Sequence, residues 1–157
     1  MQMKKLLITV IVILLICCVF TACGSEKEIQ FEPQNAADEL QKSEAFSDIL
    51  SPVGPAIAAM LYGVDEADID TCSVLCSTGA TAEEIAVFRC KDEASAAKVE
   101  QGAKARVQSQ KEAYESYAPQ EIPKLEAAAI RRAGVYVVSV VAEDSTKILP
   151  ILDKYLK

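Results

Sequence analysis

The heptapeptide VYVVSVV occupies residues 135–141 and carries the strongest strand signal in the chain. β-Branched residues favour strands, and here apolar residues fill both sides of the two-residue period except at Ser139. A strand that is apolar on both faces is typical of a position covered on both sides. We therefore expect this segment to lie centrally in a sheet that has other elements packed on each face.

Three further segments have the period or composition of strands. Residues 71–77 alternate with a spacing of two, and residues 85–90 are β-branched and aromatic. Residues 128–132 form a third strand that turns at Gly134 into the heptapeptide. Residues 81–84 also fit a helical capping box, but the apolar run that follows is too short for a helix, so a strand is favoured.

Helical periods occupy much of the remaining sequence. The clearest one, residues 92–117, has apolar side chains at steps of three and four and ends before Pro119. Shorter helices are predicted over residues 36–42, between Pro55 and Gly63, and from Asp144 or Ser145 to Leu156. The order of elements predicts an α+β domain, in which an antiparallel sheet of about four strands packs against the long amphipathic helix.

Two segments near the start of this domain have less regular sequence patterns. Phe46, Ile49 and Leu50 follow the first short helix with helical spacing. Two prolines and a glycine within residues 51–55 then predict a turn.

The N-terminal segment determines where the protein is expected to work. Lys4 and Lys5 precede an apolar run, and the tetrapeptide Phe20-Thr21-Ala22-Cys23 is followed by small and charged residues. This is the pattern of a secretory signal. A cysteine at the cleavage position resembles the lipobox of bacterial lipoproteins, although Phe20 stands where an aliphatic residue is usual. The resemblance implies that Cys23 is lipidated and becomes the mature N-terminus.

An uncleaved membrane anchor is the alternative. A spanning helix needs about 20 apolar residues, whereas the run from Leu6 to Ala22 has 17. The predicted organisation is therefore a lipoprotein signal peptide at 1–22, a lipidated N-terminus and flexible tether at 23–35, and a single α+β domain at 36–157. Both interpretations place that domain outside the cytoplasm, on the extracytoplasmic face of the cell membrane.

Composition excludes several classes of function. The chain has no histidine, which rules out Ser-His-Asp and Cys-His catalysis and imidazole metal sites. From Cys23 onward, 14 basic residues face 23 acidic ones, a net charge of −9. An acidic domain is repelled by nucleic acid and by anionic lipid headgroups, so membrane attachment falls to the lipid on Cys23. We expect no nucleic-acid partner, no cofactor and no metal.

The three cysteines that follow Cys23 are the strongest candidates for a chemical role. If residues 72–77 and 85–90 form a hairpin with Cys72 opposite Cys90, their β-carbons come close enough for a disulfide, which an exported protein can form. The alternative is that Cys72, Cys76 and Cys90 are all small buried hydrophobic residues. Three thiols without histidine fall short of a zinc site.

Clustered carboxylates are a second candidate. Glu83-Glu84 and the acidic run at 65–70 could bind Ca²⁺ or act as general acid and base, but neither has the spacing of a calcium loop. Solvated loop charge and helix capping are the preferred interpretation.

Several short motifs resemble an uncharacterised family of small lipoproteins from Gram-positive bacteria, classed as a domain of unknown function. The residues that carry the resemblance lie between about 61 and the C-terminus: Leu61-Tyr62-Gly63-Val64-Asp65, Ala82 to Phe88, Ser109-Gln110-Lys111, Glu115 to Pro119, Gly134 to Val137 and Glu143-Asp144. The resemblance implies the lipoprotein location and supports a hairpin at Gly134. It implies no activity and no site residue.

Two classes of function follow from these observations. The first is a membrane-anchored binding or accessory module of the cell envelope, either a partner of another envelope protein or a module that captures a substrate. The alternative is an extracytoplasmic enzyme that uses carboxylate, Ser/Lys or Cys chemistry. A concave pocket with two or more titratable groups of perturbed pKa would favour the enzyme.

Overall fold

The computed structural model describes residues 29–157. They form a five-stranded antiparallel sheet with the strand order β1-β2-β3-β5-β4. Its strands are β1 (Ser51–Val53), β2 (Ile69–Cys76), β3 (Glu84–Cys90), β4 (Ala129–Ala133) and β5 (Tyr136–Val141).

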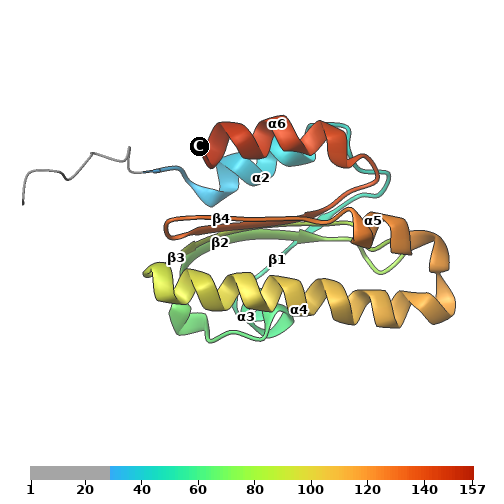
Figure 1. Ribbon diagram of the computed structural model, residues 1–157, viewed down its shortest axis with the longest axis horizontal. Coiled ribbons are helices and arrows are strands. Elements are labelled where there is room, and N and C mark those ends of the chain that lie inside the picture. Colours follow the sequence, from blue (N-terminus) through green and yellow to red (C-terminus); the bar gives the residue numbers. More distant parts are fainter. Residues whose placement is uncertain (1–28) are drawn as a thin grey trace, which may run out of the picture.

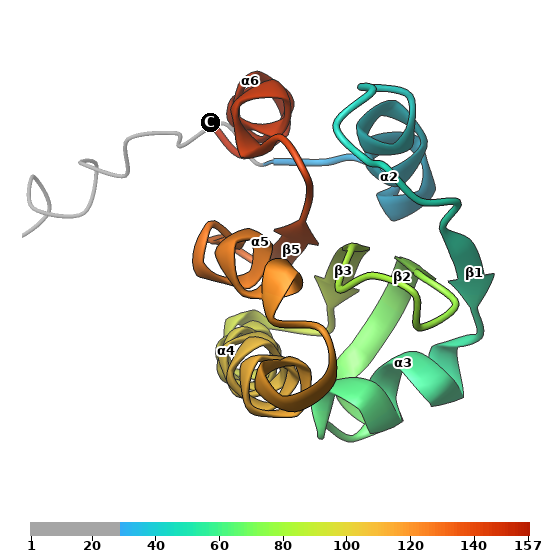
Figure 2. The same ribbon diagram turned by 90° about the vertical axis from the view of Figure 1, so that its right-hand side faces the viewer.

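Helices cover both faces of this sheet (Figures 1 and 2). The helices α2 (Pro33–Gln41) and α6 (Ser145–Tyr155) lie on one face, and α3 (Pro55–Tyr62) and α4 (Glu93–Tyr117) lie on the other. The short elements are η2 (Glu66–Asp68), η3 (Pro119–Glu121) and α5 (Ile122–Glu126). Within the described chain, no helix is both long enough and apolar enough to cross a bilayer.

The core is divided by the sheet into two layers, and β5 contributes to both. Val138 and Val140 pack with residues of α2 and α6, whereas Val137 packs with Phe88 and Val99 on the side of α4. All six residues of β5 are buried. The predicted α+β class, the long helix against the sheet and the coverage of this strand on both sides are confirmed, with five strands instead of about four.

The fifth strand is β1, where the sequence predicted a turn. Ser51, Pro52 and Val53 pair with Cys76, Leu75 and Val74 at the edge of the sheet. An edge strand tolerates proline because the outer side of the strand needs no N–H donor. The helical spacing at residues 46–50 also does not correspond to a helix, because this segment is irregular. It follows Glu44, whose φ of 57° is not helical.

Ordered structure begins earlier than the predicted boundary at residue 36. The helix α2 starts at Pro33 with Glu32 as its N-cap. The ring of Phe31 stacks on Tyr136 with centroids 4.1 Å apart, and its backbone N–H donates to Tyr136 Oη over 3.1 Å. Residues 29–35 therefore belong to the domain and are not tether, because an aromatic side chain gains more from burial here than from solvation.

Gly102 explains how α3 and α4 approach each other. A β-carbon at this position would overlap the backbone carbonyl of Tyr62 at the end of α3 and crowd Val64. Gly63 then ends α3 in the left-handed conformation, with φ at 62°. The glycine inside α4 is therefore required by helix–helix contact, and it outweighs the lower helix propensity of glycine.

We expect Gly102→Ala to destabilise the domain by about 2 kcal/mol, because overpacking against a backbone carbonyl exceeds the roughly 1 kcal/mol that alanine gains in helix propensity. The measurement is urea unfolding followed by circular dichroism. Gln101→Ala, at the exposed neighbouring position, is the control and should change the free energy of unfolding by less than about 0.5 kcal/mol. Equal or greater stability of Gly102→Ala would contradict this account of the contact.

Candidate functional site

The most unusual polar feature of the domain lies at the start of β3, where two neighbouring glutamates point to opposite faces of the sheet. Glu83 is 1% exposed and Glu84 is 4% exposed. Their prediction as solvated loop charges is therefore wrong. A buried carboxylate must be paired and hydrogen-bonded, and the two glutamates achieve this with different partners.

Glu84 binds Arg106 of α4 on the α3–α4 side of the sheet. Arg106 Nε lies 2.8 Å from Oε1 of Glu84, and Arg106 Nη2 contacts Oε2, so the pair is bidentate. Tyr62 Oη donates to Oε1 over 2.7 Å, and Cys76 Sγ donates to Oε2 over 3.3 Å. Tyr62 also lies edge-on to Phe88, which fixes the ring in the core.

The pKa values around Glu84 follow from this arrangement. Burial, reinforced by the Glu84 charge, raises the pKa of Tyr62 well above its usual range. The same two causes raise the pKa of the Cys76 thiol to about 12. Burial alone would lower the pKa of Arg106, but its contact with Glu84 more than offsets this and the pKa is raised. All three groups are therefore protonated at neutral pH.

Glu83 holds the loop before β1 on the other side of the sheet. Its carboxylate accepts the backbone N–H groups of Ser47 and Asp48, over 3.0 and 2.9 Å to Oε2, and the Ser47 hydroxyl over 2.6 Å. Lys124 of α5 lies 3.0 Å away. Burial acts to raise the pKa of Glu83, but these hydrogen bonds outweigh it and the pKa is lowered.

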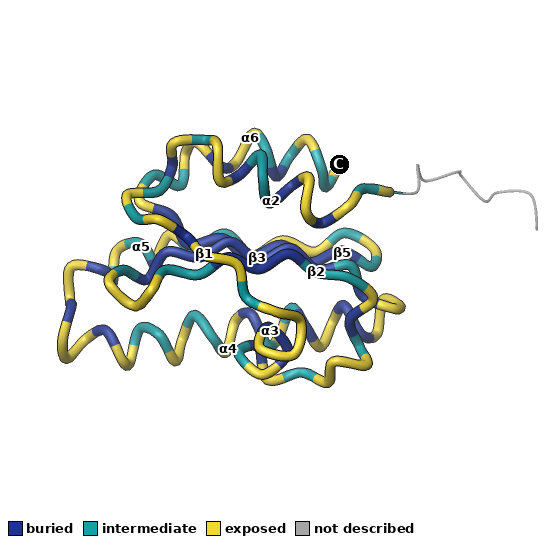
Figure 3. Tube along the Cα trace, turned by 180° about the vertical axis from the view of Figure 1, so that it is seen from behind, coloured by how far each residue is buried: buried dark blue, intermediate teal, exposed yellow. Residues whose placement is uncertain are grey.

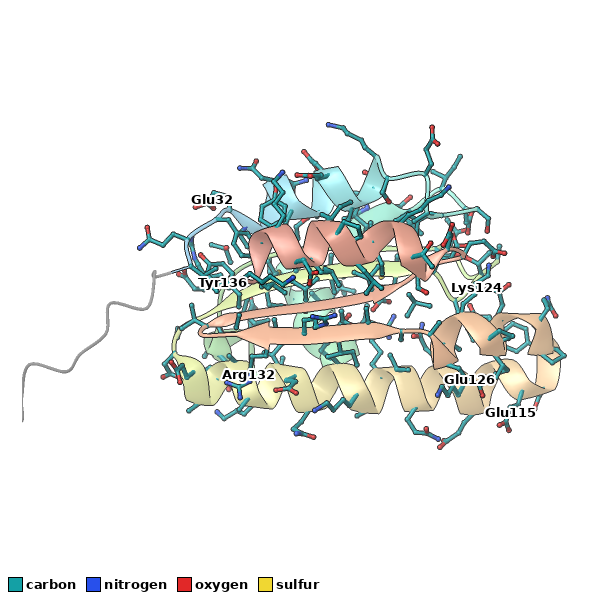
Figure 4. The ribbon with its side chains drawn as sticks, turned by 45° about the horizontal axis from the view of Figure 1, so that its top comes forward. Glu32, Glu115, Lys124, Glu126, Arg132 and Tyr136 are labelled. Atoms are coloured by element: carbon teal, nitrogen blue, oxygen red, sulfur yellow. The ribbon has the colours of Figure 1, made fainter. Side chains whose placement is uncertain are left out.

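Lys124 is shared among three carboxylates. Its Nζ lies 3.1 Å from Glu121 and 2.7 Å from Glu143, besides Glu83. Burial would lower the pKa of Lys124, but the carboxylates raise it above its usual range, so this lysine is no general base. Figure 4 places Lys124 at the end of the sheet opposite to Glu32 and Tyr136.

The sequence did not single out Arg106 or Lys124. Arg106 lies on α4 one turn after Gly102, on the side turned toward α3, and Lys124 lies on the short helix α5. The available signal was the Glu-Glu pair itself, since two adjacent carboxylates that open a buried strand require two cations from opposite faces.

The acidic run at 65–70 behaves as predicted for capping. Asp65 accepts the N–H of Ala67 over 2.8 Å at the start of η2. Asp68 accepts from Ser95 and pairs with Lys98. Across residues 29–157, no group of three or more His, Cys, Asp or Glu side chains is arranged to hold a metal ion.

The cysteines do not meet as the predicted hairpin required. β2 and β3 pair with Cys72 opposite Phe88 and Cys76 opposite Glu84, whereas Cys90 faces Ile69. The predicted register is wrong by two residues, because the β2–β3 connection places Cys76 opposite Glu84 and not opposite Ala86. The argument for a Cys72–Cys90 disulfide depended on that register, and all three cysteines of the described chain are free.

A cavity of about 520 Å³ lies beside the first described residues. Among the described residues that line it, Arg89 is the one cation, and it already pairs with Glu32 at 3.0 Å and Asp70 at 2.7 Å. The described part of the lining therefore offers no unpaired cation to an anionic ligand. The residues that line it are Ile29, Gln30, Phe31, Glu32, Arg89, Val135 and Tyr136.

Three of the five exposed large hydrophobic side chains in the described chain lie within residues 49–60, a stretch that contains β1 and much of α3 and is largely exposed in Figure 3. Ile49 is 82% exposed, Met60 67% and Ile57 46%. Exposed prolines and an alanine adjoin them in the chain. We call this region the β1–α3 surface, and its residues are Ile49, Pro52, Pro55, Ala56, Ile57 and Met60.

Breaking the Glu84–Arg106 pair should be costly. We expect Arg106→Met to lower the free energy of unfolding by about 3–5 kcal/mol, because it leaves the Glu84 carboxylate buried without its cation. Urea unfolding measures the loss. Lys104→Met, which removes an exposed pair with Glu100 on the same helix, should cost less than about 0.5 kcal/mol. Similar small losses for both variants would refute the importance of the pair.

The buried thiols should be unreactive. The pKa of Cys90 is also raised to about 12, chiefly by burial. A shift from 9.0 to about 12 lowers the thiolate fraction near pH 8 roughly a thousandfold, since each pKa unit is a factor of ten. We expect iodoacetamide to leave Cys76 and Cys90 unmodified in the folded protein and to modify both in guanidinium. Peptide mapping by mass spectrometry reads each site, and rapid modification of either thiol in the folded protein would contradict the pKa direction.

Cys23, the predicted lipidation site, lies outside the described residues.

Comparison with known proteins identifies the family of this chain. No curated protein and no solved structure matches this sequence. The family model of a domain of unknown function, DUF4358, matches residues 50–142, from the residue before β1 to the residue after β5. Because this match covers more than half of the sequence, the chain belongs to the DUF4358 family.

Proposed function

We propose that the protein is an extracytoplasmic lipoprotein, anchored in the cell membrane through acylated Cys23, whose domain is a binding or accessory module of the cell envelope. The lipobox-like tetrapeptide at residues 20–23 supports the anchor. Two or more acyl chains are needed for firm attachment, at about 0.8 kcal/mol per buried CH₂. Attachment by lipid suits a domain whose net charge disfavours electrostatic binding to a membrane.

The observation that carries the binding role is the β1–α3 surface. Three large apolar side chains are exposed within residues 49–60, and exposed apolar patches are typical of interaction sites. An enzyme would need an activated group. The titratable groups around Glu84 and Lys124 are instead held protonated or ion-paired, which disfavours Cys or Lys nucleophiles in these two clusters.

The point where the chain joins the domain also fits an anchored module. Phe31 is fixed by Tyr136 through stacking and two hydrogen bonds, and Glu32 pairs with Arg89. Phe31 lies eight positions after Cys23, which at about 3.3–3.6 Å per residue allows a reach of no more than about 29 Å. In this proposal the domain stays close to the bilayer, and the end with Lys124 and the β2–β3 loop faces away from it.

Replacement of Cys23 tests the anchor. We expect Cys23→Ala to abolish incorporation of a labelled fatty acid and to leave the unprocessed precursor, because no thiol remains to be acylated. The measurements are fluorography and the mass of the N-terminal peptide. Cys17→Ala and Cys18→Ala, within the predicted signal peptide, should have no effect. A membrane-bound wild-type chain that retains residues 1–22 and carries no fatty acid would establish the uncleaved anchor instead.

A further inference from the structure

The β1–α3 surface is unusual for the surface of a soluble domain. The helix α3 reads PAIAAMLY and contains no charged residue, yet half of its residues are exposed. A helix on the surface normally turns a polar face to water, and a helix that is apolar all round is normally covered. Residues 49–64 contain no charged side chain at all. The composition of this segment therefore matches a covered surface.

The edge of β1 does not favour a further strand as the covering element. β1 has three residues, and the central one, Pro52, has no N–H to donate. Short edge strands with proline resist extension of the sheet. A partner must therefore bind through side-chain contacts with α3 and the loop around Ile49, which is how apolar helices are recognised.

The charge around the β1–α3 surface distinguishes among the remaining candidates for what covers it. The apolar segment is flanked by Asp48 on one side and by Asp65 and Glu66 on the other, and η2 packs against α3. A surface that lies in a bilayer normally combines apolar residues with Lys and Arg, and residues 48–66 contain neither. A second copy of the chain would bring the same acidic flanks and the same net negative charge, so the two would repel each other. Charge complementarity favours a basic protein.

We propose that the β1–α3 surface docks a basic amphipathic helix of another envelope protein. The apolar face of that helix covers Ile57 and Met60, and its Lys or Arg residues lie beside Glu66 and Asp65. This assignment rests on the proposed function, since it assumes an extracytoplasmic domain held at the membrane. It adds the chemistry of the partner, which neither the family match nor the sequence indicates.

Site-specific photo-cross-linking in intact cells tests the assignment on the full-length protein. A photoreactive phenylalanine analogue replaces Ile57 in one variant and Met60 in another, and Leu149 of α6, which is 39% exposed, in the control. Because these positions are exposed, the replacements should leave the thermal unfolding midpoint unchanged. We expect adducts from positions 57 and 60, and none from 149, with a peptide of another protein that combines an apolar face with net positive charge.

A charge variant distinguishes specific docking from nonspecific contact between apolar surfaces. Glu66→Lys should lower the adduct yield from position 60 up to about fivefold, since it replaces an attractive contact at the rim with a repulsive one. Glu115→Lys, an exposed change near the end of α4, should leave the yield unchanged.

The other outcomes overturn the assignment. Adducts with phospholipid would show that the surface lies in the bilayer, and adducts with the same chain would show a homodimer. Equal adducts from position 149, or none from positions 57 and 60, would show that no specific partner binds there. In each of these cases a fatty acid on Cys23 would leave the lipoprotein proposal standing, whereas its absence, with the protein in the cytoplasm, would reject the proposed function itself.

Discussion

Helices cover both faces of the sheet, and most other features of the domain depend on that constraint. The inner strands β3 and β5 are covered on both faces, so most of their side chains are apolar in both directions. Helices that pack this closely need small residues at the contacts. Gly102, directly beneath the carbonyl of Tyr62, is the clearest case, because even a methyl group has no room there.

The same constraint explains the two buried ion pairs. β3 begins with polar residues that are still inside the covered region, and adjacent residues of a strand point to opposite faces. Glu83 and Glu84 therefore cannot share a cation. Lys124 reaches one from α5, and Arg106 reaches the other from α4. In doing so the two pairs join β3 to elements distant in sequence, including the loop at Ser47 that leads into β1.

The buried carboxylates around β3 and the exposed apolar segment differ in how the domain itself explains them. The carboxylates around β3 are matched by cations and hydrogen bonds, which makes them structural. The apolar segment at residues 49–60 has no such explanation within the domain, since Ile49 and Met60 contact water instead of core. The exposure of this uncharged segment is the feature on which the proposed binding role rests.

The sequence by itself determined the fold class, most element positions and the absence of imidazole chemistry. Period-two and helical patterns report burial directly, and the strands at 85–90 and 135–141 and the long helix at 92–117 were found because burial repeats along them. The hairpin at Gly134 could also be predicted from the sequence, because its φ of 54° lies in the left-handed region that favours glycine. Tertiary structure decided the rest. The segment that contains Pro52 forms an edge strand only because β2 pairs with it. Phe31 belongs to the domain because its ring stacks on Tyr136. The register that separates Cys72 from Cys90 depends on the β2–β3 connection, which places Cys76 opposite Glu84, and the burial of Glu83 and Glu84 depends on cations 41 and 22 residues away, respectively. Such contacts join residues with no local relation in the chain, so no periodic pattern records them.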